Sequence, residues 1–404
     1  MLYSGQEVLD YVREEKVKFV KLAFCDIFGQ PKNVSILSSE LENAFADGIS
    51  FDASAVRGFG GVAHSDLFLF PDPSTMTPVP WRPTHGRVIR MYCEVRDPSG
   101  KKSELDSRTI LKRAVEQAAS REIECYFGAE QEFYLFKTDE LGARTLQPID
   151  EAGYMDTAPD DAGENVRREI CLSLEEMGIS PEASHHEEGP GQNEIDFRYS
   201  DPLRAADNTV TFKAVVRSVA ERSGLWASFD PKPLTHKSGN GMHINISPRS
   251  PRGGDVFSPF MAGIMEHIRE ITLFLNPTEG SYERLGSHKA PRFVSWSPEN
   301  RSQLIRIPAS TGERKRFELR SPDPLTNPYL AFALLIYAGL DGVERGLTPP
   351  EPVELDLFYA PDSVTRKLLR LPATRAEAAS LAASSDFVRK HLPQEIIDLF
   401  VQDN

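Results

Sequence analysis

Six side chains of the kind that bind metal ions stand on short segments in which charged and apolar residues alternate. The six are Glu130, Glu132, Glu187, Glu194, His243 and Glu318. Because successive side chains of a strand point to opposite faces, each segment offers an apolar face to a core and a charged face to a site. Carboxylates favour hard divalent cations, and the neighbouring guanidiniums fit phosphate and carboxylate groups. The pattern therefore indicates metal-assisted phosphoryl chemistry.

The alternating segments are predicted to be strands of one sheet that forms a basin lined with carboxylates and guanidiniums. They cover residues 130–136, 194–199, 242–247 and 316–320. In the third of them, His243, Asn245 and Ser247 share one face. His185 and His186 are expected to pack beside the metal-binding strands rather than to bind zinc, because no Cys-x-x-Cys or spaced histidine pair accompanies them.

The composition argues against some classes of function. The chain has 404 residues, 40% hydrophobic and 26% charged, with a formal net charge of -14. This length allows two domains with a sizeable core. The negative charge argues against a nucleic-acid or anionic-membrane binder. No apolar run approaches the roughly 20 residues of a membrane span, and the N-terminus does not resemble a signal peptide, so we expect a cytoplasmic protein with reduced cysteines.

The remaining elements suggest two domains, 1–97 and 98–404, with the boundary at the turn of Asp97–Gly100. The first contains a predicted helix, two strands and a second helix, at residues 6–16, 19–24, 32–37 and 41–46. In the second, strands and helices interleave. Its predicted helices cover residues 107–119, 162–177, 201–223, 259–275 and 327–345.

Five blocks of sequence, in order and along nearly the whole chain, resemble the glutamine synthetase family. They are residues 51–54 with 65–66, 128–133, 185–194, 232–243 and 300–329. The resemblance implies an α+β fold with a small N-terminal β-grasp-like domain and a large catalytic domain, whose antiparallel sheet forms the metal-lined basin. It also implies a homo-oligomeric ring, a hexamer or a dodecamer, with active sites between subunits. The chain ends at Asn404, tens of residues before the usual bacterial end, which leaves one ring or two open.

The resemblance also implies roles for individual residues. One Mg²⁺ or Mn²⁺ ion would be bound by Glu132, Glu187 and Glu194. A second such ion would be bound by Glu130, His243 and Glu318. The substrate-binding positions are Gly239, Arg284, Arg301, Arg320 and Tyr154. The nucleotide-binding positions are Asn245, Ser247, Arg306 and Arg316. The catalytic positions are Asp52, Arg301 and Glu187, with Asp52 reaching in from the adjacent subunit.

The reaction that the resemblance implies belongs to nitrogen metabolism. ATP would activate the γ-carboxylate of glutamate as an acyl phosphate, and ammonium would then attack it. Lys289 departs from the family pattern, because ammonium-using members have a glutamate at the corresponding position of a flap before an Ala-Pro pair. A lysine reverses the charge there, which favours an organic amine as acceptor, and we keep a γ-glutamyl ligase as the alternative. A non-catalytic nucleotide- or metabolite-binding member and a phosphotransferase acting on a nitrogen compound are further alternatives. Retention of all six metal ligands argues against the non-catalytic one.

Overall fold

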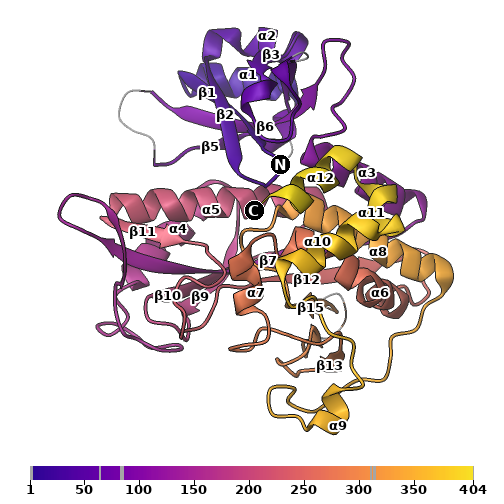
Figure 1. The fold of residues 1–404 in the computed structure, drawn as a ribbon. Helices are drawn as coiled ribbons and strands as arrows, with labels where there is room; N and C mark the ends of the chain where they lie inside the picture. The colour runs from indigo at the N-terminus through magenta and orange to yellow at the C-terminus, as the bar shows by residue number, and fades with distance from the viewer. Residues whose placement is uncertain (1–2, 63–64, 82–85, 310–311, 313–314, 404) are drawn as a thin grey trace.

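Two sheets organise the part of the chain that the computed structural model describes, residues 3–62, 65–81, 86–309, 312 and 315–403 (Figure 1). The smaller, N-terminal sheet has six strands, with the order β2-β1-β6-β4-β3 and with β5 paired to β6. These strands are β1 (Phe19–Cys25), β2 (Pro31–Leu37), β3 (Ile49–Asp52), β4 (Asp66–Pro71), β5 (Thr77–Pro78) and β6 (Val88–Arg96). β1 runs parallel to β6, whereas the other pairs are antiparallel.

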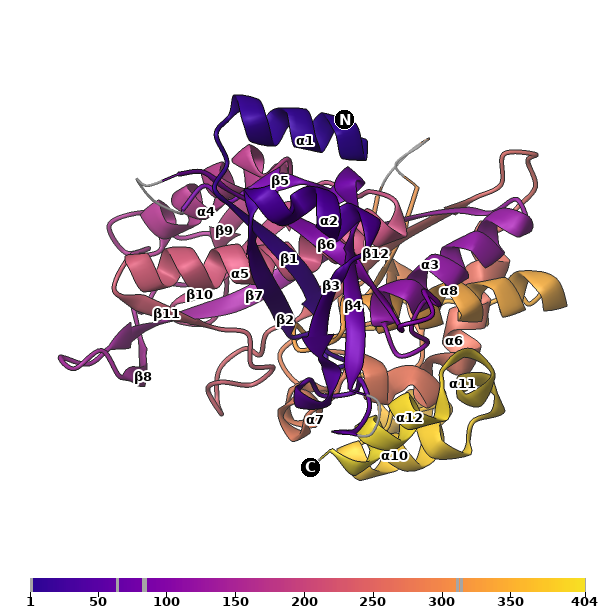
Figure 2. The ribbon, with the colours of Figure 1, turned by 90° about the horizontal axis from the view of Figure 1, so that it is seen from above.

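Two helices, α1 (Gly5–Glu14) and α2 (Leu41–Ala46), complete this N-terminal unit, seen from above in Figure 2. The Ser4 hydroxyl accepts from the Glu7 amide and the Glu7 carboxylate accepts from the Ser4 amide, so a capping box starts α1. Val8 and Val12 lie on the buried side of α1 in a separate small core. The predicted β-grasp-like unit is therefore present.

The larger sheet has nine strands in the order β13-β14-β15-β12-β7-β10-β9, with β8 and β11 also paired to β7. All pairs are antiparallel except β13 with β14. Its strands are β7 (Glu124–Thr138), β8 (Arg144–Pro148), β9 (Pro181–His186), β10 (Gln192–Phe197), β11 (Leu225–Ser228), β12 (Met242–Arg249), β13 (Trp296–Pro298), β14 (Ile305–Ile307) and β15 (Phe317–Leu319). The predicted α+β fold with this sheet at its centre is confirmed.

Helices cover one face of the larger sheet. Phe133 of β7 packs on Phe212 of α5, with ring centroids 6.1 Å apart, and Phe127 packs on Phe332 of α8 at 4.7 Å. The helices of the larger domain are α3 (Ser107–Ser120), α4 (Glu164–Glu176), α5 (Pro202–Arg222), α6 (Phe257–Leu275), α7 (Glu279–Arg284), α8 (Pro328–Arg345), α9 (Asp362–Thr365), α10 (Arg375–Ser384), α11 (Asp386–His391) and α12 (Gln394–Gln402). Because side chains alternate along β7, Glu130 must point to the face opposite to Phe127 and Phe133.

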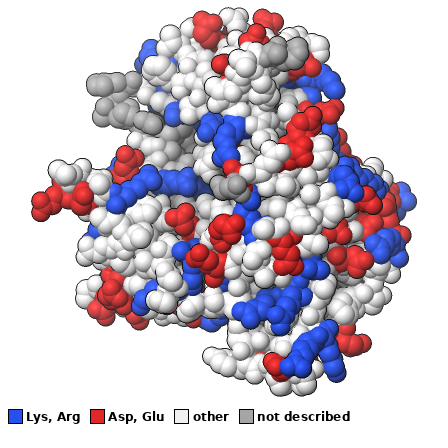
Figure 3. Space-filling model, viewed as in Figure 1, with Lys and Arg blue, Asp and Glu red and all other residues white. Residues whose placement is uncertain are grey.

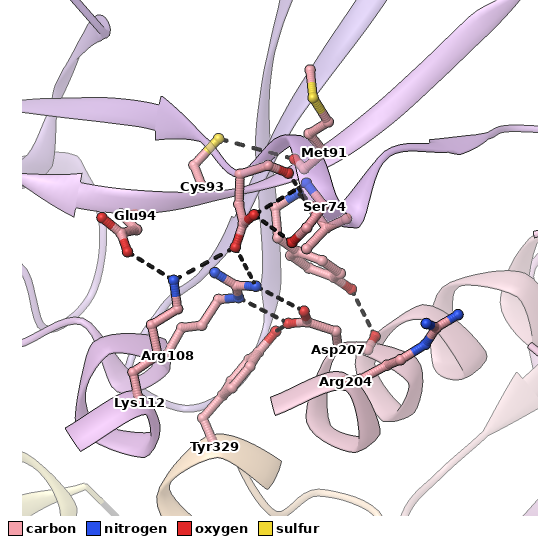
Figure 4. Close-up of polar contacts among 12 residues, drawn as sticks. Ser74, Met91, Cys93, Glu94, Arg108, Lys112, Arg204, Asp207 and Tyr329 are labelled. Atoms are coloured by element: carbon pink, nitrogen blue, oxygen red, sulfur yellow. Dashed lines mark hydrogen bonds and ion pairs between the residues drawn. The ribbon is translucent and has the colours of Figure 1, made fainter. Parts of the chain in front are cut away.

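A buried network of charged groups joins the two domains (Figure 4). The Arg108 guanidinium of α3 donates from Nε and Nη2 to the two carboxylate oxygens of Asp207 on α5, both at 3.0 Å. Its Nη2 also lies 3.1 Å from Asp72 Oδ2 of the N-terminal domain, and Tyr329 of α8 donates to Asp207 Oδ1 at 2.6 Å. Residues far apart in the sequence thus meet at one point.

The surface carries charges of both signs. On the face seen in Figure 3, acidic and basic side chains are interspersed over both domains. Among the helices that the structure describes, none is long and apolar enough to cross a membrane.

Candidate active site

Strand register brings the predicted metal ligands together on the face of the larger sheet opposite to Phe127 and Phe133. The pairing of β10 with β7 sets Glu194 opposite Glu132, and the pairing of β12 with β7 sets His243 opposite Glu130. On the far side of β12, Glu318 of β15 stands opposite Asn245. Directly opposed side chains lie about 4.5–5.5 Å apart at Cβ, which is close enough to share an ion.

These residues surround a cavity of about 570 Å³, of which Glu130, Glu132, Glu187, Glu194 and His243 form the wall. Glu318 lies just behind this wall, and its residue is only 1% exposed. The predicted substrate-side residues also line this cavity. They are Tyr154, Gly239, Arg284, Arg301 and Arg320.

Three groups of potential ligand atoms, each within 4.8 Å of one another, lie at this cavity: Glu130, His243 and Glu318; His185, Glu187 and Glu194; and Glu130, Glu194 and Asp196. The first matches one predicted ligand set. Glu132 belongs to none of the three; its Oε2 instead accepts from the Gly241 amide at 2.8 Å and the Gln192 side chain at 3.2 Å.

The crowded carboxylates at the β7–β10 side resist ionisation. Burial and the neighbouring Glu187 raise the pKa of Glu132 to about 7. Burial and Glu130 likewise raise the pKa of Asp196 to about 7, and burial with the surrounding acids raises that of Glu194 well above its ordinary value. Arg284 and Arg320 offset this effect only in part at Glu132, so a bound divalent cation would favour the ionised carboxylates.

At the β12–β15 side the charges are balanced by arginines. Glu318 accepts from Arg306 Nη1 at 2.7 Å and from Arg320 Nη1. Burial opposes its ionisation, but Arg320 and the other cations hold its pKa below the ordinary value. Burial and Arg320 lower the pKa of His243 well below its ordinary value, so its imidazole is neutral and keeps a lone pair for a metal ion.

The donor set fits hard divalent cations. Carboxylate oxygens dominate the three groups, one imidazole completes each of the first two, and no thiolate lies among the described residues that line the cavity. Mg²⁺ and Mn²⁺ both accept such ligands, whereas a structural zinc site would call for thiolates or several imidazoles.

The arginines of the site are held in place by main-chain and side-chain acceptors. Arg284 is 3% exposed and donates to the carbonyls of Ser321 (2.7 Å) and Arg320 (3.2 Å). Arg316 Nε donates to Asn245 Oδ1 at 2.9 Å, and Asn245 Nδ2 donates to Glu130 Oε1 at 2.6 Å. Asn245 therefore couples a guanidinium to a predicted metal ligand, although it carries no charge.

A second cavity of about 490 Å³ adjoins the first and shares Glu130, Asp196 and Arg316 with it. Asn245 and Ser247 line this second cavity, and Ser247 Oγ donates to the Lys315 carbonyl at 2.8 Å. Of the four predicted nucleotide-side residues, Arg316 therefore lies where the two cavities meet, Asn245 and Ser247 line the second, and Arg306 lines the first.

Two predicted site residues line neither cavity within a single chain: Glu318, which lies just behind the wall of the first, and Asp52. Asp52 ends β3 in the N-terminal domain, where its Oδ1 accepts from the Ser54 amide at 3.0 Å and caps the short helix Ala53–Ala55. Its predicted role in a neighbouring subunit stays a prediction.

Sequence reasoning missed four residues of the site. Asp196 and His185 belong to the close ligand groups, and Gln192 contacts Glu132. At Gly241, a Cβ atom would lie 2.6 Å from Arg284 Nη2 and 2.8 Å from His243 Nε2, so only glycine fits between them. The alternation of charge at Glu194 and Asp196 was a signal for Asp196, because both side chains must point to the same face.

Comparison with known proteins identifies the family. Sequence profiles of the glutamine synthetase beta-Grasp domain and the glutamine synthetase catalytic domain match residues 16–98 and 104–403. Glutamine synthetase of Clostridium saccharobutylicum is 42% identical over 99% of this chain and 94% of its own, and that of Methanosarcina mazei is 42% identical over 98% and 92%. A solved complex of a protein named GmaS with ADP is 28% identical, with a TM-score of 0.87 over 98% of this chain and 94% of its own. The chain belongs to the glutamine synthetase family.

Lowering the pH from about 8 to about 6 is expected to weaken Mn²⁺ binding roughly tenfold, because Glu132, with a pKa of about 7, must lose a proton first. Because the pKa of Glu132 is raised in the folded protein, ionisation of Glu132 lowers the free energy of unfolding. In the metal-free protein this cost is absent below the ordinary pKa of 4.5 and grows as the pH rises toward 7. Calorimetric Mn²⁺ titrations at both pH values check this, and thermal unfolding with and without Mn²⁺ should show metal stabilisation that increases with pH. Affinity independent of pH would contradict the assignment.

Proposed function

We propose that the protein is an ATP-dependent glutamate–ammonia ligase that activates the γ-carboxylate of glutamate as an acyl phosphate and passes the acyl group to ammonium. One observation carries the proposal. Carboxylates of β7, of β10 and of Glu187 after β9 face five arginines across one cavity, with Glu318 of β15 behind its wall, in a chain of the glutamine synthetase family. The arginines are Arg284, Arg301, Arg306, Arg316 and Arg320.

The first half of the reaction brings several anions together. Bound divalent cations would neutralise phosphate charge and polarise the transferred group. Arg316, at the junction of the two cavities, and Arg306, in the first one, are suited to the phosphates of ATP, and Arg301 to the transferred phosphoryl group. At the other end, Arg284 and Arg320 would hold glutamate with the help of the Gly239 backbone.

The second half requires an acceptor that has lost a proton and a site that excludes water. Tyr154 and Glu187 line the cavity at this acceptor end. We propose Glu187, and Asp52 of an adjacent subunit in a ring-shaped hexamer or dodecamer, as the proton acceptors. A ring is consistent with Asp52, which its own chain does not bring to the cavity.

The direct test is a phosphate-release assay with ATP, Mg²⁺ and glutamate, in which ammonium is compared with a panel of small amines and polyamines and the products are identified by mass. Glutamine formed only when ATP, metal and ammonium are all present would support the proposal. Phosphate release without any amide product would refute it.

Lys289 supports a second candidate, a γ-glutamyl ligase that uses an organic amine. Its ammonium group lines the cavity, pairs with Glu188 and lies 5.8 Å from the centroid of the Tyr154 ring. His288 and Lys289 both adopt left-handed backbone conformations, with φ of 44° and 66°. Such conformations are costly for residues other than glycine, so surrounding contacts must hold the lysine at this position. A fixed positive charge beside the acceptor end disfavours a small cation and leaves room for other amines.

Replacing Lys289 by glutamine is expected to lower the KM for ammonium about fivefold, with little change in the KM for ATP. The change removes the positive charge of Lys289, whose repulsion of an ammonium ion bound beside the Tyr154 ring costs roughly 1 kcal/mol. It also frees Glu188 to attract a cation. Steady-state kinetics over a range of ammonium concentrations measure it. Lys237→Gln is the matched control, because Lys237 is an exposed lysine that does not line the cavity. An unchanged or increased KM for ammonium in Lys289→Gln would contradict this role.

A further inference from the structure

We propose that Asp150 and His186 are positioning residues that fix the metal ligand Glu187 and the acceptor-side Tyr154 relative to each other. The inference rests on the proposed function, because it assigns residues to the same site. Neither side chain lines the cavity. The His186 side chain is fully buried and that of Asp150 is 5% exposed, so what they contact is protein.

The His186 ring bridges the main chain of Glu187 and the carboxylate of Asp150. Its Nδ1 lies 2.6 Å from the Glu187 carbonyl oxygen and its Nε2 lies 3.1 Å from Asp150 Oδ1. A carbonyl and a carboxylate can only accept, so the ring donates in each contact that it makes. On its other side, the Glu187 amide donates to the Gln192 carbonyl at 2.8 Å. Both main-chain polar groups of Glu187 are therefore satisfied, and its side chain is directed into the cavity from a fixed backbone.

Asp150 gathers three parts of the chain around its carboxylate. Besides His186, Oδ1 accepts from the Gly191 amide at 2.7 Å, and Oδ2 accepts from the Ala162 amide at 3.0 Å. Gly191 belongs to the turn between β9 and β10, which separates Glu187 from Glu194. Asp150 thereby ties this turn to both ends of the segment 150–162.

The segment 150–162 carries Tyr154, and His186 holds its middle as well. The Met155 amide donates to the His186 carbonyl at 2.9 Å, and Met155 has a left-handed φ of 60°. Asp150 and His186 thus hold Tyr154 through the main chain on one side and Glu187 on the other. A buried, hydrogen-bonded carboxylate–histidine pair behind a metal ligand typically governs that ligand's orientation, and losing it costs about 10–100-fold in metal affinity.

The arrangement predicts a selective effect on one of two metal sites. Glu130, His243 and Glu318 receive none of these contacts, so the ion that they would bind should be unaffected. Conversely, the ion assigned to Glu132, Glu187 and Glu194 should bind more weakly when Asp150 or His186 is changed, and the acceptor should bind more weakly with it.

The test is Mn²⁺ binding to the full-length protein, followed by electron paramagnetic resonance of the free ion, for wild type, His186→Gln and Asp150→Asn. We expect two sites per chain in wild type, and in both variants a loss of about 10–100-fold in affinity at one site with less than about a twofold change at the other. The KM for ammonium should rise, while that for ATP stays within about twofold. Asp150→Asn keeps the shape of the side chain, so the proposal remains testable if His186→Gln does not fold.

His267→Gln is the matched control. His267 is also a buried histidine whose Nε2 lies 2.9 Å from a carboxylate oxygen, Asp341 Oδ2, but it lies on α6 and lines neither cavity. His267→Gln protein should lose thermal stability without selective loss of Mn²⁺. Folded Asp150→Asn or His186→Gln protein that binds two Mn²⁺ ions as wild type does would overturn the proposal. Because binding is measured without turnover, a wild-type protein that binds Mn²⁺ but makes no amide would refute the proposed function alone.

Discussion

Replacing Glu318 by glutamine is expected to lower the turnover number of amide synthesis about 10³-fold. Glu318 is 1% exposed, lies 3.5 Å from His243 Nδ1 and belongs to the same close ligand group as Glu130. An amide has nearly the same shape but no charge, so it binds a divalent cation weakly. Its N–H groups would also face Arg306 and Arg320, which the carboxylate now neutralises.

Two measurements on the same sample distinguish a loss of catalysis in Glu318→Gln from a loss of folding. Phosphate release and product mass give the turnover number, while Mn²⁺ binding should show loss of the site formed with His243. Glu124→Gln is the matched control: Glu124 lies on β7 with the same strand-face parity as Glu130, but it is exposed and contacts Tyr126 instead. Turnover in Glu318→Gln within about tenfold of wild type would show that this carboxylate is not a metal ligand in the reaction.

The sequence predicted which faces carry the chemistry, because alternation along a strand determines the direction of each side chain. Glu130 and Glu132 had to point away from Phe133, and they do so. The register between neighbouring strands could not be predicted in this way. No local pattern says that His243 pairs with Glu130, since a shift by two residues would keep every side chain on the same face and change every partner.

Partners brought together by tertiary structure could not be predicted either. Asp150 sits in a loop and reads as an ordinary surface acid, yet it contacts His186, 36 residues later in the chain. The interpretation of His186 as a packing residue agrees with its burial, whereas His185 lies at the cavity, 3.0 Å from Glu187. The two adjacent histidines have opposite surroundings because they point to opposite faces of β9.

Replacing Arg108 by methionine is expected to destabilise the protein by about 3–5 kcal/mol, the largest stability effect of a single change that we foresee. The Arg108 side chain is 4% exposed and neutralises Asp207 and, in part, Asp72 (Figure 4). Without the guanidinium, Asp207 would be a buried carboxylate whose one side-chain partner among the described residues is the Tyr329 hydroxyl, at 2.6 Å. With an unfolding entropy of roughly 2 cal/mol/K per residue, the expected fall in Tm is about 4–6 °C.

A double-mutant cycle distinguishes loss of the ion pair from loss of packing. Arg108→Met should cost far more than Arg113→Met, because Arg113 is an exposed arginine on the same helix α3. Changing Asp207 to asparagine in the Arg108→Met background removes the stranded charge, so the double variant should recover at least about 2 kcal/mol relative to the sum of the single changes. Additive effects on Tm, measured at one scan rate and one protein concentration, would show that Arg108 stabilises the domain junction through its volume alone. Recovery of stability in the double variant would show that the junction depends on the balance of opposite charges that α3, α5 and the N-terminal domain contribute together.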